Sequence, residues 1–380
     1  MDTHAVRDSD GSLRCPLTWP HVLAEGGNRI RGGEVASAFR VGLTHDLSFM
    51  IGSASAGDTG LEILGEAPGL EWEFLLEEPP ELGPQQVQGY DALVVLGPRV
   101  PASALESASD LTVVARFGVG YDNVDIDACT RNGIAVTITP DGVRRPMATA
   151  IMTFMLALGG RLFQKDRLAR NGAWGDKQDF MGLGLTGRVL GSVGLGNIAR
   201  ELFALARPFE MRHIAYDPYV APDAATGVEL VDLPTLFSSA DFLVINCALT
   251  TGTHHLVNAE RLSLMKPTDF LINTARGPIV DQVALTEALI ADRLAGAALD
   301  VFEHEPVDPN DPILSLENVI VSPHALGWTD EWLRLSGRSA FGGILDVAVG
   351  REPPHVVNRE VLGTLEFQHK LKRYAERRRA

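Results

Sequence analysis

The sequence predicts an α/β protein with two doubly wound, Rossmann-like domains, each built on a parallel sheet. Two observations lead to this prediction. Short apolar segments rich in β-branched residues alternate with helix-length segments from residue 39 onward, a pattern typical of parallel strands covered by helices on both faces. The alternation forms two consecutive series, and a chain of 380 residues is too long for one ordinary core.

The first series holds five expected strands. It follows residues 1–36, which mix Gly, Asp, Arg and Asn without periodicity and therefore indicate a flexible or partly ordered extension. The five expected strands are FRVGLT (39–44), WEFLL (72–76), DALVVL (91–96), LTVVA (111–115) and IAVTI (134–138).

A long helix is expected between the two series, from Met147 to about Asn171. Its first half is apolar nearly all round, which predicts burial on more than one side at a domain or subunit contact. The end of the chain, HKLKRYAERRRA, is basic, and we expect a solvated terminal helix there. The strands of the second series are RVLGSV (188–193), RHIAY (212–216), DFLVIN (241–246), DFLINT (269–274), GAALDV (296–301) and NVIVS (318–321).

Composition limits the classes of function. The formal net charge of -16 at pH 7 argues against nucleic acid binding, which requires clustered Lys and Arg. Cys15, Cys129 and Cys247 lie far apart and form no CxxC pair, so neither a disulfide framework nor a zinc cluster is indicated. The apolar stretch 147–160 is too short to span a bilayer, and no apolar run near the N-terminus resembles a signal peptide. We expect a cytoplasmic protein that binds neither membrane nor metal.

The segment GSVGLGNIA (191–199) predicts a dinucleotide-binding turn. It follows an expected strand and opens a helix. Gly194 permits the tight turn, and Gly196 lets the backbone approach a pyrophosphate. Ala199, in the place of the usual third glycine, still permits close packing of helix on strand. The N-terminus of the helix offers unpaired N–H groups to the phosphates.

Asp217 ends the next expected strand. A carboxylate there can accept hydrogen bonds from both ribose hydroxyls of NAD and repels the 2′-phosphate of NADP. The alternative is that Asp217 only opens the Asp-Pro turn. Because the residue follows the glycine turn at the usual spacing, we expect NAD as cofactor.

Three further motifs lie at or near the carboxyl ends of later strands, where open α/β sheets bind ligands. They contain Arg276 in NTARG, Glu305 in DVFEHEP and His324 in SPH. Singly, the arginine can cap a helix, the glutamate can be a solvated loop acid, and the histidine can serve packing alone. Together they provide what reduction of a 2-oxo acid needs: a guanidinium that clamps the carboxylate and polarises the carbonyl, an imidazole that transfers the proton, and a carboxylate that orients that imidazole.

With these motifs, the sequence resembles the D-isomer-specific 2-hydroxyacid dehydrogenase family. The motifs FGVGYDNVD (117–125), GLGNIA, Asp217, NTARG, ALDVFEHEP and SPH occur in the order and spacing of that family, over roughly residues 39–350. The resemblance implies catalytic roles for Arg276, Glu305 and His324, and two domains whose inserted member binds NAD. The implied limits are an N-terminal extension (1–36), the substrate domain (37–138), the NAD domain (139–322), the C-terminal part of the substrate domain (323–360) and a basic tail (361–380).

The resemblance also implies ligand contacts and a homodimer formed through the NAD domains. Backbone amides of Val119 and Gly120 are the implied carboxylate-binding groups, with Arg276. The implied cofactor contacts are Gly194, Gly196, Asn197, Ile198, Asp217, Cys247, Ala248, Thr253, Thr274 and Asp300.

The sequence departs from the family pattern in two segments. TPDGVRRPMATA (139–150) has Val143 where Asn is common and Thr149-Ala150 where Glu-His is common, and NCALT (246–250) replaces a typical His-x-Pro-Leu-Thr. These departures leave the identity of the substrate open. Glu305, rather than Gln, argues against the formate-oxidising branch.

Alternatives remain at this point. One is an NAD-sensing regulatory protein on the same scaffold, similar to the corepressors that resemble this family. Another is a phosphite- or phosphoglycerate-type dehydrogenase, which keeps the same catalytic residues and changes the substrate pocket. Arg144 or Arg145 is a candidate for selecting a substrate with a second anionic group, and the alternative is that both are solvated or salt-bridged.

Overall fold

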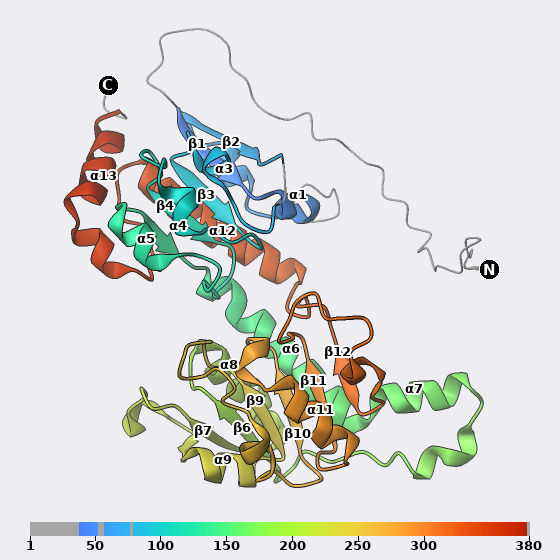
Figure 1. Ribbon diagram of the computed structural model, residues 1–380. Helices are drawn as coiled ribbons and strands as arrows, with labels where there is room; N and C mark the ends of the chain where they lie inside the picture. The colour runs from blue at the N-terminus through green and yellow to red at the C-terminus, as the bar shows by residue number, and fades with distance from the viewer. Residues whose placement is uncertain (1–37, 52–56, 77–78, 378–380) are drawn as a thin grey trace, which may run out of the picture. The chain divides into compact units, whose positions relative to one another are not determined.

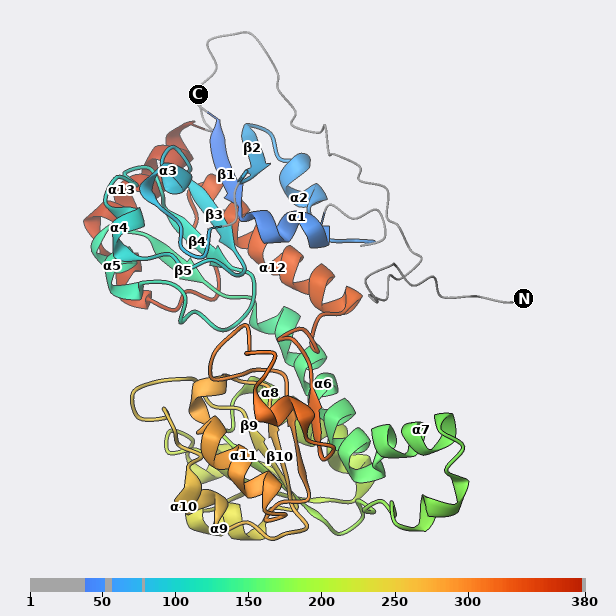
Figure 2. The ribbon, with the colours of Figure 1, turned by 45° about the vertical axis from the view of Figure 1, so that its right-hand side comes forward.

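The computed structural model describes residues 38–51, 57–76 and 79–377. The extension expected at residues 1–36 lies outside them. The described part contains two fully parallel sheets, one of five strands and one of seven. Figure 1 labels most of the strands and helices, and Figure 2 shows them from a second side. The predicted fold class, two α/β units on parallel sheets, is confirmed.

The first sheet has the strand order β2-β1-β3-β4-β5. Its strands are β1 (Phe39–Leu43), β2 (Leu70–Phe74), β3 (Ala92–Val95), β4 (Val113–Arg116) and β5 (Ala135–Thr137). Its helices are α1 (His45–Ile51), α2 (Glu62–Gly65), α3 (Pro84–Val87), α4 (Ala102–Leu105), α5 (Ile126–Arg131), α12 (Asp330–Ala348) and α13 (Leu365–Arg377). One face packs on α1, α2, α12 and α13 and the other on α3, α4 and α5. Coverage on both faces explains why β3 is a continuous apolar run, all of it buried.

The second sheet has the strand order β12-β11-β10-β9-β6-β7-β8. Its strands are β6 (Val189–Val193), β7 (Arg212–Tyr216), β8 (Glu229–Leu230), β9 (Phe242–Ile245), β10 (Phe270–Asn273), β11 (Gly296–Leu299) and β12 (Val319–Val321). Helices α9 (Leu233–Ser239), α10 (Ala259–Leu262) and α11 (Gln282–Ile290) cover one face. Helices α6 (Pro140–Gly160) and α8 (Asn197–Ala206) cover the other. β8 was not predicted, because two residues at a sheet edge carry no periodicity.

The helix expected from Met147 to about Asn171 is two helices, so this prediction is wrong in its bounds. α6 begins at Pro140, where the fixed φ of proline suits a first turn. It ends at Gly160, because Arg161 adopts a left-handed conformation with φ 50°, and α7 (Leu162–Arg170) follows after a bend of 57°. α6 is buried against α8 and α12, which agrees with the expected burial on more than one side.

No single helix in the described residues is long and apolar enough to cross a membrane. Among the described helices, only α6 and α7 taken together meet that condition, by length and composition, and they are bent at their junction.

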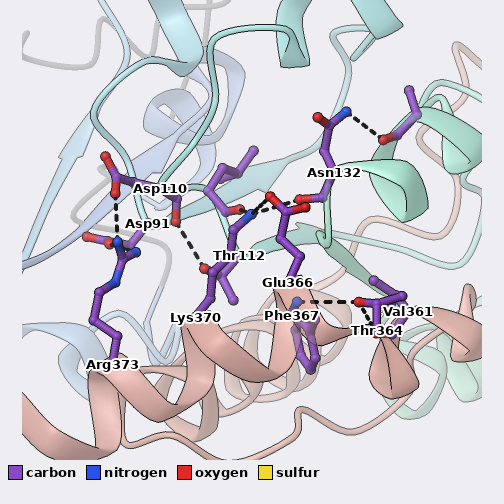
Figure 3. A network of polar contacts seen from close by, with 12 residues as sticks. Asp91, Asp110, Thr112, Asn132, Val361, Thr364, Glu366, Phe367, Lys370 and Arg373 are labelled. Atoms are coloured by element: carbon purple, nitrogen blue, oxygen red, sulfur yellow. Dashed lines mark hydrogen bonds and ion pairs between the residues drawn. The ribbon is translucent and has the colours of Figure 1, made fainter.

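The terminal helix α13 is not a solvated tail, so that expectation is wrong for one of its faces. Phe367, Leu371 and Tyr374 are buried in the core of the first sheet. Lys370 is buried as well, and its Nζ donates to the carbonyl oxygens of Leu111 and Asn132 at 2.8 Å each. Figure 3 shows these contacts together with the ion pair of Arg373 and Asp110. The amphipathic pattern of α13 is hard to recognise in the sequence, because its buried face includes Lys and Tyr. Both carry long apolar stems below their polar ends, so they can be buried although they count as polar residues.

Candidate active site

The predicted site residues of the second sheet all follow the carboxyl ends of its parallel strands, and so lie at one edge. β6 pairs with β7 on one side and β9 on the other, so the direction of strand succession reverses between β6 and β9. Ligands bind outside such a reversal in open α/β sheets. The glycine turn after β6 and Cys247 after β9 meet there: a Cβ atom on Gly194 would lie 3.1 Å from the Cys247 nitrogen.

The turn after β6 has the geometry that the sequence predicts for a phosphate-binding loop. Gly194 has φ 97°, a conformation that favours glycine, and its amide donates to the Tyr216 carbonyl at 2.7 Å. Gly196 stands at the N-cap of α8, with Asn197 and Ile198 in the first turn. A Cβ atom on Gly196 would meet nothing within 4 Å, so a pyrophosphate has open space against backbone amides.

Asp217 joins the two loops that border this space. Its Oδ2 accepts a hydrogen bond from the Leu195 amide at 2.8 Å, and its Oδ1 accepts one from the Tyr219 amide at 2.9 Å. Each carboxylate oxygen has a second lone pair, so both can also accept from ribose hydroxyls. The residues present therefore fit NAD: open backbone at a helix N-terminus for the phosphates, and an acid one strand away for the ribose.

The remaining predicted cofactor contacts lie along the same edge. Cys247 and Ala248 follow β9, and the Thr253 hydroxyl donates to the Ala248 carbonyl at 2.7 Å, which closes the turn after that strand. Thr274 follows β10 and Asp300 follows β11. Burial raises the pKa of the Cys247 thiol to about 11, with a smaller contribution from the charge of Asp217, so this thiol is protonated at neutral pH.

Asp300 holds the loop that carries His324. Its Oδ1 accepts hydrogen bonds from the amides of Ala325 (3.0 Å) and Leu326 (3.1 Å), and from the Ser322 hydroxyl. Burial raises the pKa of Asp300, and these hydrogen bonds oppose that rise. His324 itself has φ 54°, an uncommon conformation outside glycine that persists where surrounding contacts enforce it. Asp300 therefore supports the histidine; whether it also contacts the cofactor stays a prediction.

His324 and Glu305 form a close pair. His324 Nδ1 lies 2.8 Å from Glu305 Oε2, and the other carboxylate oxygen accepts from the Phe302 amide at 3.0 Å. Burial favours the neutral form of Glu305, but the hydrogen bond and charge of His324, the Phe302 amide and the charge of Arg276 outweigh it and lower the pKa of Glu305. The carboxylate is thus ionised at neutral pH, and it can hold the imidazole with Nδ1 as donor and Nε2 directed elsewhere.

Arg276 lies beside this pair. It follows β10 at the start of a short 3-10 helix, with no capping hydrogen bond from its side chain, so the helix-cap alternative does not apply. A Cβ atom on the next residue, Gly277, would overlap the carbonyl of Phe302. The arginine segment therefore packs directly on the loop whose Phe302 amide holds Glu305.

The predicted substrate loop reaches the same place from the first sheet. A Cβ atom on Gly120 would overlap the Arg276 guanidinium, so Gly120 allows a side chain from one sheet to lie against the backbone of the other. Val119 adjoins it and packs against the core of the first sheet. The structure thus brings together Arg276, Glu305, His324 and the Val119–Gly120 loop.

Two charged residues lie beside the site in addition to those predicted: Arg116, which the sequence offers only as a substitute for Arg276, and Asp122, which was missed. Arg116, at the end of β4, lies beneath the loop, and its Nη1 donates to the Phe117 carbonyl at 2.6 Å. Burial, with a smaller effect of nearby Arg276, lowers the pKa of Arg116 to about 10. Asp122 pairs with Arg276, and no local motif could show a contact across 154 residues.

A contact between a histidine and a carboxylate joins two of the loops that carry site residues. His255 Nε2 lies 2.6 Å from Glu303 Oε1. The contact ties the turn that carries Thr253 to the loop that carries Glu305.

Arg144 and Arg145 both face α8. Arg145 Nη1 lies 2.6 Å from Glu201 Oε1, and Arg144 Nε lies 3.6 Å from Glu201 Oε2. Both arginines are therefore salt-bridged, and this arrangement gives no support to a role for either of them in selecting a substrate.

The chain is similar to proteins of one known family. Residues 152–325 match the NAD binding domain of the D-isomer specific 2-hydroxyacid dehydrogenase family. A glyoxylate reductase of Korarchaeum cryptofilum is 38% identical over 284 residues, which are 73% of this chain and 86% of that protein. A D-3-phosphoglycerate dehydrogenase of Methanocaldococcus jannaschii is 38% identical over 318 residues, 80% of this chain but only 59% of that protein.

A solved structure has the same fold. The NADPH-dependent glyoxylate/hydroxypyruvate reductase of Sinorhizobium meliloti, in complex with NADP and malonate, superposes with a TM-score of 0.73 at 27% identity. The match covers 86% of this chain and 98% of that structure.

A parallel sheet with a dinucleotide-binding turn, joined to a second parallel sheet at an edge that holds Arg, Glu and His, defines an NAD-dependent oxidoreductase. The chain belongs to the D-isomer-specific 2-hydroxyacid dehydrogenase family. It is an NAD-dependent enzyme of the type that interconverts 2-hydroxy acids and 2-oxo acids at a CH–OH group.

Proposed function

We propose that this enzyme reduces a short 2-oxo acid, such as glyoxylate or hydroxypyruvate, with Arg276, His324 and Glu305 as its catalytic residues. The observation that carries the proposal is the 2.8 Å contact between His324 Nδ1 and Glu305 Oε2, at the same edge as the Arg276 guanidinium. The relatives named as glyoxylate reductases support this substrate class.

In this proposal Arg276 and the amides of Val119 and Gly120 bind the substrate carboxylate. A guanidinium has five N–H donors in a fixed fork, and those that remain free beside its protein contacts face the substrate. They hold the carboxylate and polarise the carbonyl, whose oxygen gains negative charge in the transition state.

The proton moves at His324 Nε2. Because ionised Glu305 accepts from Nδ1, the imidazolium is stabilised, and Nε2 donates its proton to the carbonyl oxygen during reduction. In the direction of oxidation, the neutral ring accepts the hydroxyl proton at the same atom. The bound nicotinamide supplies or accepts the hydride.

NAD is held, in this proposal, by the glycine turn and by side chains along the edge of the second sheet. Gly194, Gly196, Asn197 and Ile198 face the pyrophosphate, and Asp217 accepts from the ribose hydroxyls. The other proposed contacts are Cys247, Ala248, Thr253, Thr274 and Asp300.

Consumption of NADH with a panel of 2-oxo acids tests the proposal. Glyoxylate or hydroxypyruvate should be reduced by the wild-type enzyme, and His324→Ala should depress both directions of the reaction at every pH. Equal turnover by His324→Ala and the wild type would remove the histidine from the reaction, and failure of every 2-oxo acid would overturn the substrate class.

We further propose that the enzyme is a homodimer formed through the segment around α7. α7 has no buried residue. Large apolar side chains are exposed on it and beside it: Leu156, Leu162, Phe163, Trp174 and Met181. Exposed apolar groups gathered in this way mark a contact surface. Light scattering during size-exclusion chromatography should give twice the mass of the chain, and the mass of one chain would contradict the proposal.

A further inference from the structure

Arg276 is engaged by a carboxylate from the other sheet. Its Nε donates to Asp122 Oδ1 at 2.9 Å, its Nη2 forms an ion pair with the same oxygen at 2.8 Å, and its Nη1 donates to the Ala275 carbonyl at 2.7 Å. Of the five N–H groups of an arginine, the one on Nε and one on Nη1 are then hydrogen-bonded to the protein. Each Nη nitrogen keeps at least one further N–H group, and one from each nitrogen can meet a carboxylate side by side.

Asp122 occupies a fixed position. The Val100 amide donates to the Asn123 carbonyl at 2.7 Å, and Asn123 Nδ2 donates to the Pro98 carbonyl at 3.0 Å. The Val124 amide donates to the Tyr121 carbonyl at 3.0 Å. Because Asn123 is hydrogen-bonded to Pro98 and Val100 after β3, and Tyr121 is hydrogen-bonded to Val124 across the turn, the backbone on both sides of Asp122 is held. Its carboxylate is therefore a well-placed partner for the long and otherwise flexible arginine side chain.

The charges around Asp122 explain why an acid stands beside a site for anions. The cations facing it are Arg276 and Arg116, and the acids nearest to these arginines are Asp46 and Glu305. Burial disfavours the charged form of Asp122, but the hydrogen bond and charge of Arg276 and the charge of Arg116 outweigh it, so the pKa of Asp122 is lowered. The carboxylate therefore remains ionised as a counter-charge for two neighbouring guanidinium groups.

We propose that Asp122 is the positioning residue of Arg276: it fixes the guanidinium so that free N–H groups of Nη1 and Nη2 face the substrate, and it balances the charge of the two neighbouring arginines. This inference rests on the proposed role of Arg276. Asp122 does not need to touch the substrate.

The inference predicts a particular division between kcat and KM. Loss of Asp122 leaves the guanidinium free to swing away from the carbonyl oxygen, and misplacement of a group that stabilises the transition state lowers kcat. The same change makes the site more positive, which favours the anionic substrate. Binding should therefore suffer much less than turnover.

The experiment compares Asp122→Ala and Asp122→Asn with the matched control Asp125→Ala. Asp125 lies in the same loop, but its Oδ1 caps α5 through the Ala128 amide at 2.8 Å. Using glyoxylate and NADH, we expect kcat to fall by about tenfold or more in Asp122→Ala, with KM changed by less than about threefold. Asp122→Asn keeps an acceptor oxygen without the charge and should lie between Asp122→Ala and the wild type. Asp125→Ala should keep its kcat, and the Kd for NADH should be unchanged in all three variants.

A double-variant cycle shows whether Asp122 acts through Arg276. In an Arg276→Lys background, Asp122→Ala should lower kcat/KM by less than about twofold, because residues that act as one unit are not additive. An equal loss in both backgrounds, or a kcat within about twofold of wild type in Asp122→Ala, would overturn the inference. Arg276→Lys with normal kinetics would instead overturn the proposed function, so the two failures are distinguishable. If Asp122→Ala does not fold, Asp122→Asn is used for the same cycle with the same criteria.

Discussion

In the proposed mechanism, the role of Arg276 depends on the geometry of its side chain as well as on its charge. Its three protein contacts orient the guanidinium, and only a planar fork can reach Asp122 and a substrate carboxylate at the same time. Arg276→Lys keeps the charge but loses this fork. We expect kcat/KM to fall by about 10²–10³-fold, with part of the loss in kcat, because carbonyl polarisation grows in the transition state.

Steady-state kinetics with one 2-oxo acid checks this prediction. Near-normal kinetics in Arg276→Lys would move the clamp elsewhere. Arg116 is then the next candidate because it lies beside the site, whereas Arg99 pairs with Glu81 at 3.7 Å and is largely exposed.

Asp217 decides between NADH and NADPH in this account. Its charge would repel a 2′-phosphate, so the wild-type enzyme should prefer NADH. Asp217→Ala should reduce the preference for NADH over NADPH, because it weakens the binding of NADH and allows NADPH to bind. Because Asp217 also holds the Leu195 and Tyr219 amides, Asp217→Asn is the matched variant: it removes the charge and keeps an acceptor for one of them. The ratio of kcat/KM for the two cofactors is the measurement, and comparable efficiency of the wild type with both would contradict the assignment.

Individual site residues could be predicted where they belong to a motif whose backbone geometry has a known function. Gly194, Gly196 and Asp217 follow from a strand, a turn and a helix in sequence. Asp122 was not predictable, because its function consists of a contact with a residue on the other sheet. The acid of GVGYDNVD is ordinary in the sequence and becomes informative only beside Arg276.

At the scale of elements, the sequence predicted the buried strands well and the ends of the helices less well. The break at Arg161 arises from a single left-handed residue, which periodicity does not report. The inward face of α13 was hidden because Lys370 and Tyr374 are polar residues that the fold buries with partners.

α13 should contribute substantially to stability. Phe367 is fully buried in the core of the first sheet, whereas Leu365, on the same helix, is 79% exposed. Phe367→Ala should lower the free energy of unfolding by about 3–5 kcal/mol, and Leu365→Ala should change it by less than about 0.5 kcal/mol. Urea unfolding followed by tryptophan fluorescence reports on this core through Trp332. Equal effects of the two substitutions would show that α13 is not part of it.

At the scale of the whole described molecule, the proposed site lies where two sheets contribute different parts. The second sheet supplies the dinucleotide turn, Arg276, Glu305 and His324, and the first supplies the Val119–Gly120 loop and Asp122. The fold class and the placement of the motifs could be predicted from the sequence, because the carboxyl ends of parallel strands meet at one edge of a sheet. The identity of the substrate could not be predicted from the sequence, because the pocket is shaped by side chains that no periodic pattern specifies.

The pH dependence of kcat/KM in both directions, for the wild type and Glu305→Gln, tests the central claim most directly. The pKa of Glu305 is below its usual range, so this carboxylate is ionised at neutral pH. Glu305→Gln removes the charge that stabilises the imidazolium. Reduction, which needs protonated His324, should then fail at lower pH than in the wild type, and oxidation, which needs the neutral ring, should persist further into acid. If neither limb moves, Glu305 is not coupled to His324, and the account of the proton transfer is wrong.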